Sequence, residues 1–301
     1  MKRRFGVIVL LCCILLAAQV GCDGGSDKRQ VGIPPNPQRI VSLSPIVTEI
    51  LYELGLGDRI IADTRYCDYP EDARNKEKAG DFLTVNEEKI VFLEPDLVID
   101  TTSRAHEKMW QRFNRAGIAV VDFDVNTLEG VYEAYEVIGR ATGTEEKARK
   151  LLAELKDDLA ELKDRCSRAE SRPRVIFFIE YPNLTAVGKD TFIDRLLADI
   201  GCVNVVTQSG WPQNFPRELV VDLKPDVIIH AVDGNVLTEA YAAEIREGWS
   251  RATTVPAVAD GRIYVVNGDT ATRPGPRVIE GWTEIARHIH PELFDRHKTV
   301  P

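Results

Sequence analysis

The chain has 301 residues, of which 44% are hydrophobic, and it contains 21 Gly and 16 Pro. This composition excludes a disordered tail, collagen, a coiled coil and a polytopic membrane protein, and the length suits two compact lobes. The formal net charge of −9 repels phosphate backbones. Since no segment concentrates Lys and Arg enough to override that charge, we expect no nucleic-acid partner.

Residues 1–21 have the pattern of an export signal. Lys2, Arg3 and Arg4 precede an uncharged apolar run at 5–18, which is short for a membrane span but suits the core of a signal peptide. Loss of these three cations leaves 35 Lys and Arg against 47 acids, a net charge of −12. We therefore expect an exported and acidic mature protein.

Cys22 follows this signal in the segment Ala-Gln-Val-Gly-Cys and precedes a polar, Gly-rich stretch. The segment resembles a bacterial lipobox, in which the cysteine is acylated and becomes the new N-terminus, although Gln19 departs from the usual aliphatic residue. Ordinary cleavage with Cys22 as a bystander is the alternative. Acylation would make 22–37 a flexible linker and would hold the protein at a membrane surface without a spanning helix.

An internal repeat predicts the architecture. Residues 88–99 and 218–229 share the pattern E-x-[IV]-V-x-L-x-P-D-[LV]-[VI]-I, with a constant offset of 130. Each copy predicts a short helix, a Pro-Asp break and an apolar strand that is buried on both faces of a parallel sheet.

The same order of elements surrounds both copies of the repeat. Apolar strands are expected at 39–45 and 174–180 before the repeats and at 118–124 and 263–269 after them. Strands that alternate with helices predict an α/β fold with two Rossmann-like lobes, an N-terminal lobe at 38–143 and a C-terminal lobe at 172–301.

Residues 144–171 lack Gly and Pro and predict one long helix between the lobes. A stripe at three- and four-residue spacing forms its apolar face: Ala148, Leu151, Leu152, Leu155, Leu159, Leu162 and Cys166. A helix of about 25 residues is about 37 Å long, which is the scale of a domain. Because ligands of α/β folds bind beyond the carboxyl ends of the strands, two facing lobes predict a ligand cleft between them.

Three cysteines remain outside the signal segment: Cys67, Cys166 and Cys202. An odd number permits at most one internal disulfide; a bond between Cys166 and Cys202 is conceivable, but spacing alone does not establish it. The chain has no Cys-x-x-Cys redox motif.

Several further motifs are spread along the chain: RIVSLSPIVTEILYELGLGDRII at 39–61, YCDYP at 66–70, GKDTFID at 188–194, WPQ at 211–213 and TRPGPR at 272–277. Together with the paired Pro-Asp segments, they resemble the substrate-binding proteins of bacterial ABC importers for vitamin B12, haem and iron-siderophores. The resemblance covers residues 37–295 and is nearest to the vitamin B12 branch. It implies a bilobed receptor with a helical backbone.

The resemblance assigns ligand contacts to Tyr66, Phe82, Trp211, Asp269 and Arg273. Core packing is the alternative for the aromatic residues, although Gly and Pro flank Trp211 in a loop. A structural ion pair is the alternative for Asp269 and Arg273. In the functional interpretation these two residues bind the amide fringe of a corrinoid, and the arginine suits a haem propionate or an acidic siderophore equally well.

The resemblance also assigns permease docking to Glu88 and Glu218. The repeat supports this assignment, because carboxylates at equivalent positions of duplicated lobes present a pseudo-two-fold pair of charges to a two-fold symmetric partner. A solvated acid in a first helical turn is the alternative for each residue, and Glu87 leaves an ambiguity of one position.

Catalytic and metal-ion chemistry have little support in the sequence. It has no G-x-S-x-G, G-x-G-x-x-G, P-loop or H-E-x-x-H motif, so we expect no enzyme, and it has no His-rich loop for a bare cation. Tyr66 or His106 remains a candidate axial ligand of a haem iron.

We therefore expect a monomeric, lipid-anchored, extracytoplasmic receptor without a resident cofactor. Its expected ligand is cobalamin, with haem or a ferric siderophore as the alternative. Its expected partners are an ABC permease and the attached ATPase subunits. An enzyme or a structural lipoprotein that reuses the fold is the alternative outside this class.

Overall fold

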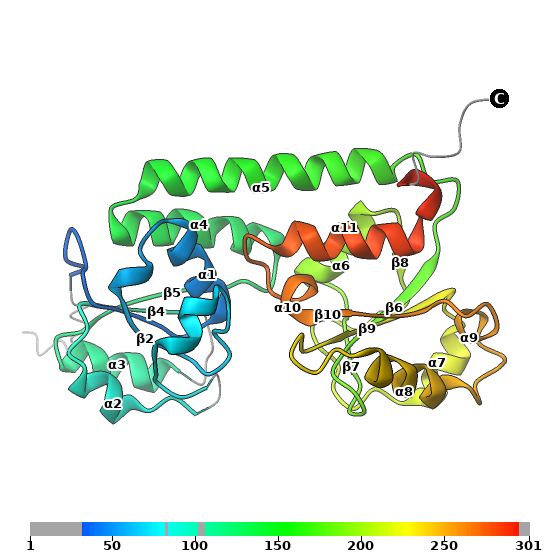
Figure 1. The fold of residues 1–301 in the computed structure, drawn as a ribbon, viewed down its shortest axis with the longest axis horizontal. Helices are drawn as coiled ribbons and strands as arrows, with labels where there is room; N and C mark the ends of the chain where they lie inside the picture. The colour runs from blue at the N-terminus through cyan, green and yellow to red at the C-terminus, as the bar shows by residue number, and fades with distance from the viewer. Residues whose placement is uncertain (1–31, 82–83, 102–105, 295–301) are drawn as a thin grey trace, which may run out of the picture. The chain divides into compact units, whose positions relative to one another are not determined.

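The computed structural model describes residues 32–81, 84–101 and 106–294. The predicted signal peptide at 1–21, the acylation site Cys22 and the ligand residue Phe82 lie outside these ranges and stay predictions. Within the described ranges, no helix combines the length and the apolar character needed to cross a bilayer. Two separate sheets, each flanked by helices, form the two predicted α/β lobes (Figure 1).

The sheet of the N-terminal lobe has the strand order β3-β2-β1-β4-β5, and each neighbouring pair is parallel. Its strands are β1 (Ile40–Ser42), β2 (Ile60–Asp63), β3 (Glu77–Lys78), β4 (Leu97–Thr101) and β5 (Ala119–Phe123). Every residue of β1 and β4 is buried, as expected for central strands that helices cover on both faces. This strand order is the Rossmann-like order that reverses direction next to β1.

The sheet of the C-terminal lobe repeats this plan around β6. Its strands are β6 (Arg174–Ile179), β7 (Thr185–Ala186), β8 (Val203–Asn204), β9 (Val227–Val232) and β10 (Ile263–Asn267). Strand β6 pairs in parallel with β8 and β9, and β9 pairs in parallel with β10. The short β7 runs antiparallel to the end of β6 and has no counterpart in the first sheet. The predicted similarity of the two lobes is confirmed, apart from β7 and from β3, which has no counterpart in the second sheet.

Helices cover both sheets. Those of the N-terminal lobe are α1 (Pro45–Glu53), α2 (Glu87–Phe92), α3 (Glu107–Arg115) and α4 (Leu128–Thr142), with 3-10 turns η1 (Gly57–Arg59) and η2 (Glu71–Asn75). Those of the C-terminal lobe are α6 (Phe192–Asp199), α7 (Arg217–Leu223), α8 (Glu239–Trp249), α9 (Pro256–Ala259), α10 (Gly268–Ala271), α11 (Val278–Ile289) and the turn η3 (Pro291–Leu293). Thr127, Thr191 and Thr238 cap α4, α6 and α8 by accepting a hydrogen bond from a backbone N–H of the first turn.

The aspartate of each Pro-Asp segment anchors the first strand of its lobe. Asp96 Oδ2 accepts hydrogen bonds from the backbone N–H groups of Gln38 (2.7 Å) and Arg39 (2.9 Å), and Asp226 Oδ2 accepts one from that of Arg174 (2.8 Å). The backbone N–H groups of Asp96 and Asp226 in turn donate to the carbonyls of Arg39 and Arg174, each at 2.8 Å. The repeated Pro-Asp motif therefore aligns the amino ends of two neighbouring parallel strands, β1 with β4 in the first lobe and β6 with β9 in the second.

The repeat also reproduces a strained backbone position. Glu94 and Lys224, which precede the two Pro-Asp units, both have a φ of 46° in the left-handed region. This conformation ends a helix sharply, and a following proline prevents its continuation. The same break in both lobes turns the chain from the short helix into the buried strand.

Helix α5 (Glu145–Cys166) connects the lobes, as predicted, but it is shorter than the expected 144–171. It ends at Cys166 because the Ser167 hydroxyl donates to the carbonyl of Asp164 (2.6 Å), and Pro173 then favours an extended chain at the preceding residue. In Figure 1, α5 lies along one side of the described chain, with α4 of the first lobe and α11 of the second beneath it.

The apolar stripe of α5 packs into one core that extends through both lobes. Its buried members are Ala148, Leu152, Leu155, Leu159, Leu162 and Cys166, while Leu151 is half-buried. The same core includes Ile99 of β4 and Trp282 of α11. Each fully buried leucine contributes about 1.5–3 kcal/mol of transfer free energy, so α5 holds the lobes together by packing.

Candidate functional site

Two adjoining cavities lie at the carboxyl ends of the strands, and residues of both lobes line them. They measure about 230 and 500 Å³ and share Pro45, Thr272 and Arg273. The segments that follow β1, β4 and β5 line most of the smaller cavity, and those that follow β6, β9 and β10 line most of the larger one. The predicted ligand cleft between the lobes is confirmed at the position that parallel sheets favour.

Three of the predicted ligand residues meet in the larger cavity: Tyr66, Asp269 and Arg273. Trp211 lines neither of these two cavities. Its ring is half-buried against Phe192, and its Nε1–H donates across the lobe boundary to Asn126 Oδ1 (3.3 Å). Since Asn126 lines the smaller cavity, Trp211 contacts a residue of the cleft wall without lining either cavity itself.

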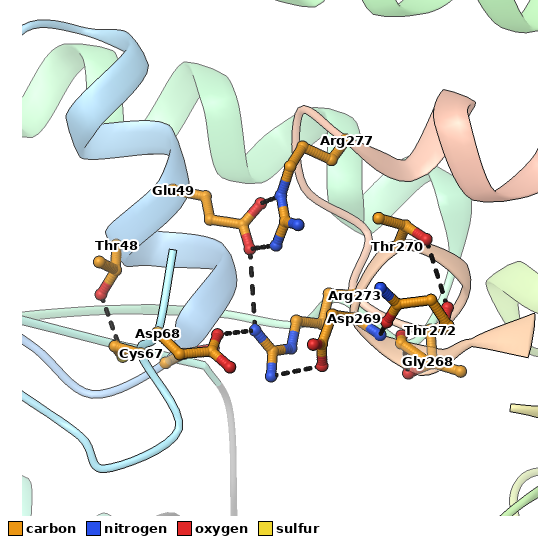
Figure 2. A network of polar contacts seen from close by, with 12 residues as sticks. Thr48, Glu49, Cys67, Asp68, Gly268, Asp269, Thr270, Thr272, Arg273 and Arg277 are labelled. Atoms are coloured by element: carbon orange, nitrogen blue, oxygen red, sulfur yellow. Dashed lines mark hydrogen bonds and ion pairs between the residues drawn. The ribbon is translucent and has the colours of Figure 1, made fainter. Parts of the chain in front are cut away.

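Arg273 joins the two lobes through carboxylates of both. Its Nη1 donates to Asp68 Oδ1 of the N-terminal lobe (2.6 Å), and its Nη2 lies 2.7 Å from Asp269 Oδ1 of the C-terminal lobe (Figure 2). The three side chains are 14–15% exposed. The ion pair that the sequence left as an alternative for Asp269 and Arg273 is therefore present, and it includes Asp68, which the sequence reasoning missed.

A second pair beside this triad, Glu49 and Arg277, is a bidentate interlobe bridge. The Nε and Nη2 of Arg277 donate to the two carboxylate oxygens of Glu49 at 3.0 and 2.6 Å (Figure 2). The guanidinium also lies 3.8 Å from the centre of the Tyr69 ring. Glu49 on α1 is only 3% exposed; Arg277 supplies its hydrogen bonds, and Arg273 Nη1 lies 3.9 Å from its Oε1 as a second, more distant cation.

The environment shifts the pKa values of these carboxyl groups in different directions. Burial raises the pKa of Glu49 and of Asp269, against the opposing effect of the nearby arginines. Burial acts in the same direction on Asp68, but the hydrogen bond and the charge of Arg273 outweigh it and lower the pKa of Asp68. Asp68 is therefore the firmly ionised partner of Arg273.

The cleft as a whole is acidic. Among the described residues that line the two cavities, Arg273 is the one cation, and two carboxylates already bind it. Asp124, Glu180 and Asp233 line the cavities as well. Such a cleft offers acceptors to the hydrogen-bond donors of a ligand and repels anionic groups.

An aromatic wall that the sequence reasoning missed lines the larger cavity together with Tyr66. Tyr181 and Tyr241 line it, with ring centres 6.4 Å apart in an edge-to-face arrangement, and the Tyr241 hydroxyl donates to the carbonyl of Tyr181 (3.0 Å). Tyr181 lies two residues after the end of the buried strand β6. A search of the strand ends for aromatic residues would have found it.

His106 is committed to an internal contact. It is 6% exposed, and its Nδ1 lies 2.7 Å from Asp100 Oδ2, which also accepts a hydrogen bond from Trp110 Nε1 (3.0 Å). In this arrangement His106 serves the packing of α3, and Tyr66 is the better placed of the two candidate axial ligands. Across the described ranges, no group of three or more His, Cys, Asp or Glu residues is arranged to hold a metal ion.

The described cysteines are buried free thiols. Burial raises the pKa of Cys166 to about 11 and that of Cys202 to about 12, and it also raises the pKa of Cys67. Thiols with such pKa values are poor nucleophiles at neutral pH. The disulfide between Cys166 and Cys202 that the sequence left open is not formed in this structure.

The two acids predicted for docking occupy equivalent places. Glu88 lies in the first turn of α2 and Glu218 in the first turn of α7; both are exposed, and neither contacts a cation of the described chain. Glu87 differs, because its carboxylate binds Arg112 Nη1 at 2.6 Å. The two positions therefore differ in charge compensation, and the assignment of docking to Glu88 stays a prediction.

The family of the chain follows from comparisons with known proteins. Residues 40–270 match the family described as periplasmic binding protein. An uncharacterized ABC transporter substrate-binding lipoprotein, YvrC of Bacillus subtilis, is 35% identical over an alignment of 324 positions that covers 98% of this chain and 99% of that protein. A vitamin B12-binding protein of Vibrio campbellii is 28% identical and covers 84% of this chain and 89% of its own length.

Solved structures agree on the fold. The vitamin B12 binding protein BtuF of Vibrio cholerae superimposes with a TM-score of 0.74 at 24% identity, over 87% of this chain and 100% of that one. A haem binding protein of Pseudomonas aeruginosa superimposes with a TM-score of 0.75 at 20% identity, over 85% and 93%. The family consists of extracytoplasmic solute-binding proteins of ABC importers rather than enzymes. With its two facing lobes, backbone helix and interlobe cleft, the chain belongs to the periplasmic binding protein family.

Proposed function

We propose that this protein captures a corrinoid, cobalamin, in the cleft between its lobes and delivers it to the permease of an ABC importer. The observation that carries the proposal is the charge of the cleft. Its one cation among the described lining residues, Arg273, is bound by Asp68 and Asp269. A corrinoid presents uncharged amide donors at its rim, which match carboxylate acceptors, whereas haem propionates are anions that need an accessible cation.

The shape and the apolar content of the cleft support the same ligand. Tyr66, Tyr181 and Tyr241 line the larger cavity of about 500 Å³, and Pro45 connects it to the smaller one. Aromatic faces bind a flat macrocycle through apolar contact, and a few polar groups orient it. Relatives named vitamin B12-binding proteins add support from the sequence side.

Haem is the second candidate, and Tyr66 is the observation that favours it. This side chain is 44% exposed and lines the larger cavity, so its phenol oxygen is accessible as an axial ligand of iron. The Arg65 guanidinium, which forms an ion pair with Asp81, lies 5.3 Å from the centre of the Tyr66 ring and is a cation close to this candidate axial ligand. Binding of a corrinoid is therefore favoured by an acidic cleft, whereas binding of haem is favoured by an accessible cation.

Titration of the purified protein with cyanocobalamin, haemin and a ferric siderophore tests the proposal, by calorimetry and tryptophan fluorescence. We expect saturable one-to-one binding of cyanocobalamin. The double variant Glu180→Gln/Asp233→Asn should weaken cyanocobalamin binding about tenfold and strengthen haemin binding, because it removes two acceptors and two negative charges. Asp157→Asn, an exposed acid of α5, is the matched control and should change neither affinity. Saturation by haemin together with no response to cyanocobalamin would refute the proposed ligand.

The proposal assigns docking on the permease to Glu88 and Glu218. Both are exposed and unpaired within the described chain, and equivalent positions of a repeated structure suit a two-fold symmetric partner. Reversal of both charges to Lys should abolish uptake and leave ligand affinity unchanged. Normal uptake by the double variant would show that docking does not use these residues.

A further inference from the structure

Helix α2 exposes an apolar surface that the folded chain does not use. The side chain of Phe92 is 85% exposed, and it is the most exposed of the large hydrophobic side chains in the described ranges. Val91 beside it is 41% exposed. Complete burial of a phenylalanine is worth about 1.5–3 kcal/mol, so leaving this ring in water forgoes a large contribution to folding.

This surface continues into a groove. A hollow of about 780 Å³ lies between α2 and the second half of α3, and Phe92, Val91, Val85 and Glu88 are among the residues that line it. We call Phe92, Val91 and this hollow the α2 groove. Its apolar floor and its acidic rim suit a partner segment that carries one apolar and one basic side chain.

The internal repeat shows that the exposed ring is specific to one lobe. At an offset of 130 residues, Glu88 corresponds to Glu218, and Phe92 corresponds to the exposed Asp222. Both lobes thus keep the acid, but one adds an aromatic ring where the other adds a second carboxylate. An exposed aromatic ring contributes little to folding, but it strengthens binding where a partner covers it.

The charges around the groove limit the kind of partner. Glu87 is neutralised by Arg112, but Glu88 has no cation of the described chain beside it. A second copy of this acidic chain, or a membrane with anionic headgroups, would be repelled. A basic segment would instead gain from Glu88 while its apolar side chain covers Phe92.

We propose that the α2 groove is an apolar docking site for the membrane subunit of the importer, with Phe92 as its anchor and Glu88 as its charged rim. The inference rests on the proposed docking function, and it goes further by making the two lobes unequal. The N-terminal lobe binds through an apolar anchor and one charge, and the C-terminal lobe binds through charge alone. The contribution of Phe92 to docking affinity should therefore change little as the salt concentration rises, because salt does not screen apolar contacts.

Site-specific photocrosslinking in the native host tests this inference. Benzoylphenylalanine replaces Phe92, Asp222 or Val203 in three separate full-length variants, and mass spectrometry identifies the crosslinked protein. Val203 is the matched control, because it is 40% exposed, as Val91 is, and lies on the edge strand β8. We expect an ABC permease subunit at positions 92 and 222 and no such product at position 203.

The outcomes separate this inference from the proposed function. Crosslinks at position 222 without any at position 92 would overturn the α2 groove and leave docking intact. An absence of permease crosslinks at both positions would overturn both proposals. Crosslinks from position 92 to lipid or to a second copy of the chain would reassign the groove and refute the inference.

A quantitative test uses the reconstituted importer once the permease is identified. Phe92→Ser should raise the concentration of binding protein that half-saturates transport by about tenfold or more, with the same factor at low and high salt. Glu88→Gln should produce a loss that fades as salt increases. Val203→Ser should stay within twofold of the wild type. Ligand affinity is measured for each variant, so that a loss of binding is not mistaken for a loss of docking.

Discussion

The bridge between Glu49 and Arg277 offers a direct test of how the lobes are held at the cleft. Arg277→Met keeps most of the length of the side chain and removes both hydrogen bonds to a carboxylate that is 3% exposed. Breaking a buried ion pair from one side costs about 3–5 kcal/mol when the remaining charge has no other partner; because Arg273 Nη1 stays 3.9 Å from Glu49 Oε1, we expect the lower end of this range. For a chain of this size, about 3 kcal/mol corresponds to a fall of about 6–12 °C in melting temperature.

The pH dependence of this loss has a definite sign. Burial already raises the pKa of Glu49 above its ordinary 4.5, and loss of Arg277 removes an effect that opposes the rise. An acid whose pKa is higher in the folded state takes up a proton on folding, so stability increases as the pH falls through that raised pKa towards 4.5. The variant should therefore be most destabilised near pH 7 and recover part of the loss near pH 5.

Thermal and guanidinium unfolding, followed by circular dichroism at pH 5 and pH 7, measure both effects. The matched control is Lys150→Met, which breaks the exposed pair between Lys150 and Glu154 (3.7 Å) and should cost less than about 1 kcal/mol. The double variant Glu49→Gln/Arg277→Met should regain part of the stability. A loss below about 1 kcal/mol for Arg277→Met, or an equal loss at both pH values, would refute the assignment of a buried and mutually dependent pair.

Two further predictions concern the cleft wall and the Pro-Asp motif. Tyr181→Ala and Tyr241→Ala should each weaken cyanocobalamin binding about tenfold in calorimetric titrations, because each removes an aromatic face from the larger cavity. Tyr264→Ala, whose ring stacks on His288 at 4.7 Å, should change the affinity less than twofold, and an equal loss there would contradict the assignment. Asp96→Ala and Asp226→Ala should each lower the free energy of unfolding by about 1–3 kcal/mol in guanidinium titrations, because each leaves strand-end N–H groups without a carboxylate acceptor. A change below about 0.5 kcal/mol in both variants would show that solvent replaces the aspartate.

The architecture could be predicted from the sequence because strands and helices are indicated by apolar patterns among neighbouring residues. Apolar runs at 97–99 and 227–229 are typical of strands covered on both faces, and the structure buries every residue of the longer strands β4 and β9. The stripe that begins at Ala148 predicted the buried face of α5, although the helix ends five residues before Ser171. The end was misjudged because it depends on local details that hydrophobic periodicity does not report, the hydrogen bond of the Ser167 hydroxyl and the effect of Pro173 on the preceding residue.

The site was only partly predictable, because its chemistry depends on pairs that are far apart in the chain. Motif resemblance indicated Tyr66, Asp269 and Arg273, and the structure brings these three together. No local pattern indicated that Arg273 binds Asp68, 205 residues away, or that Arg277 binds Glu49, 228 residues away. Hydrophobic periodicity reports which face of an element is buried, but it carries no information on which distant charge the buried face will meet.

The sequence by itself therefore determined the two lobes, the connecting helix, the equivalent positions of Glu88 and Glu218, and the family resemblance. These features follow from periodicity, turn residues and an internal repeat, all of which act over a few residues. The tertiary structure decided that the cation of the cleft is already bound by carboxylates, that Tyr181 and Tyr241 form a wall, and that Phe92 stays in water. Those properties arise only in the folded chain, because charge compensation, side-chain contacts and exposure depend on residues that are far apart in the sequence.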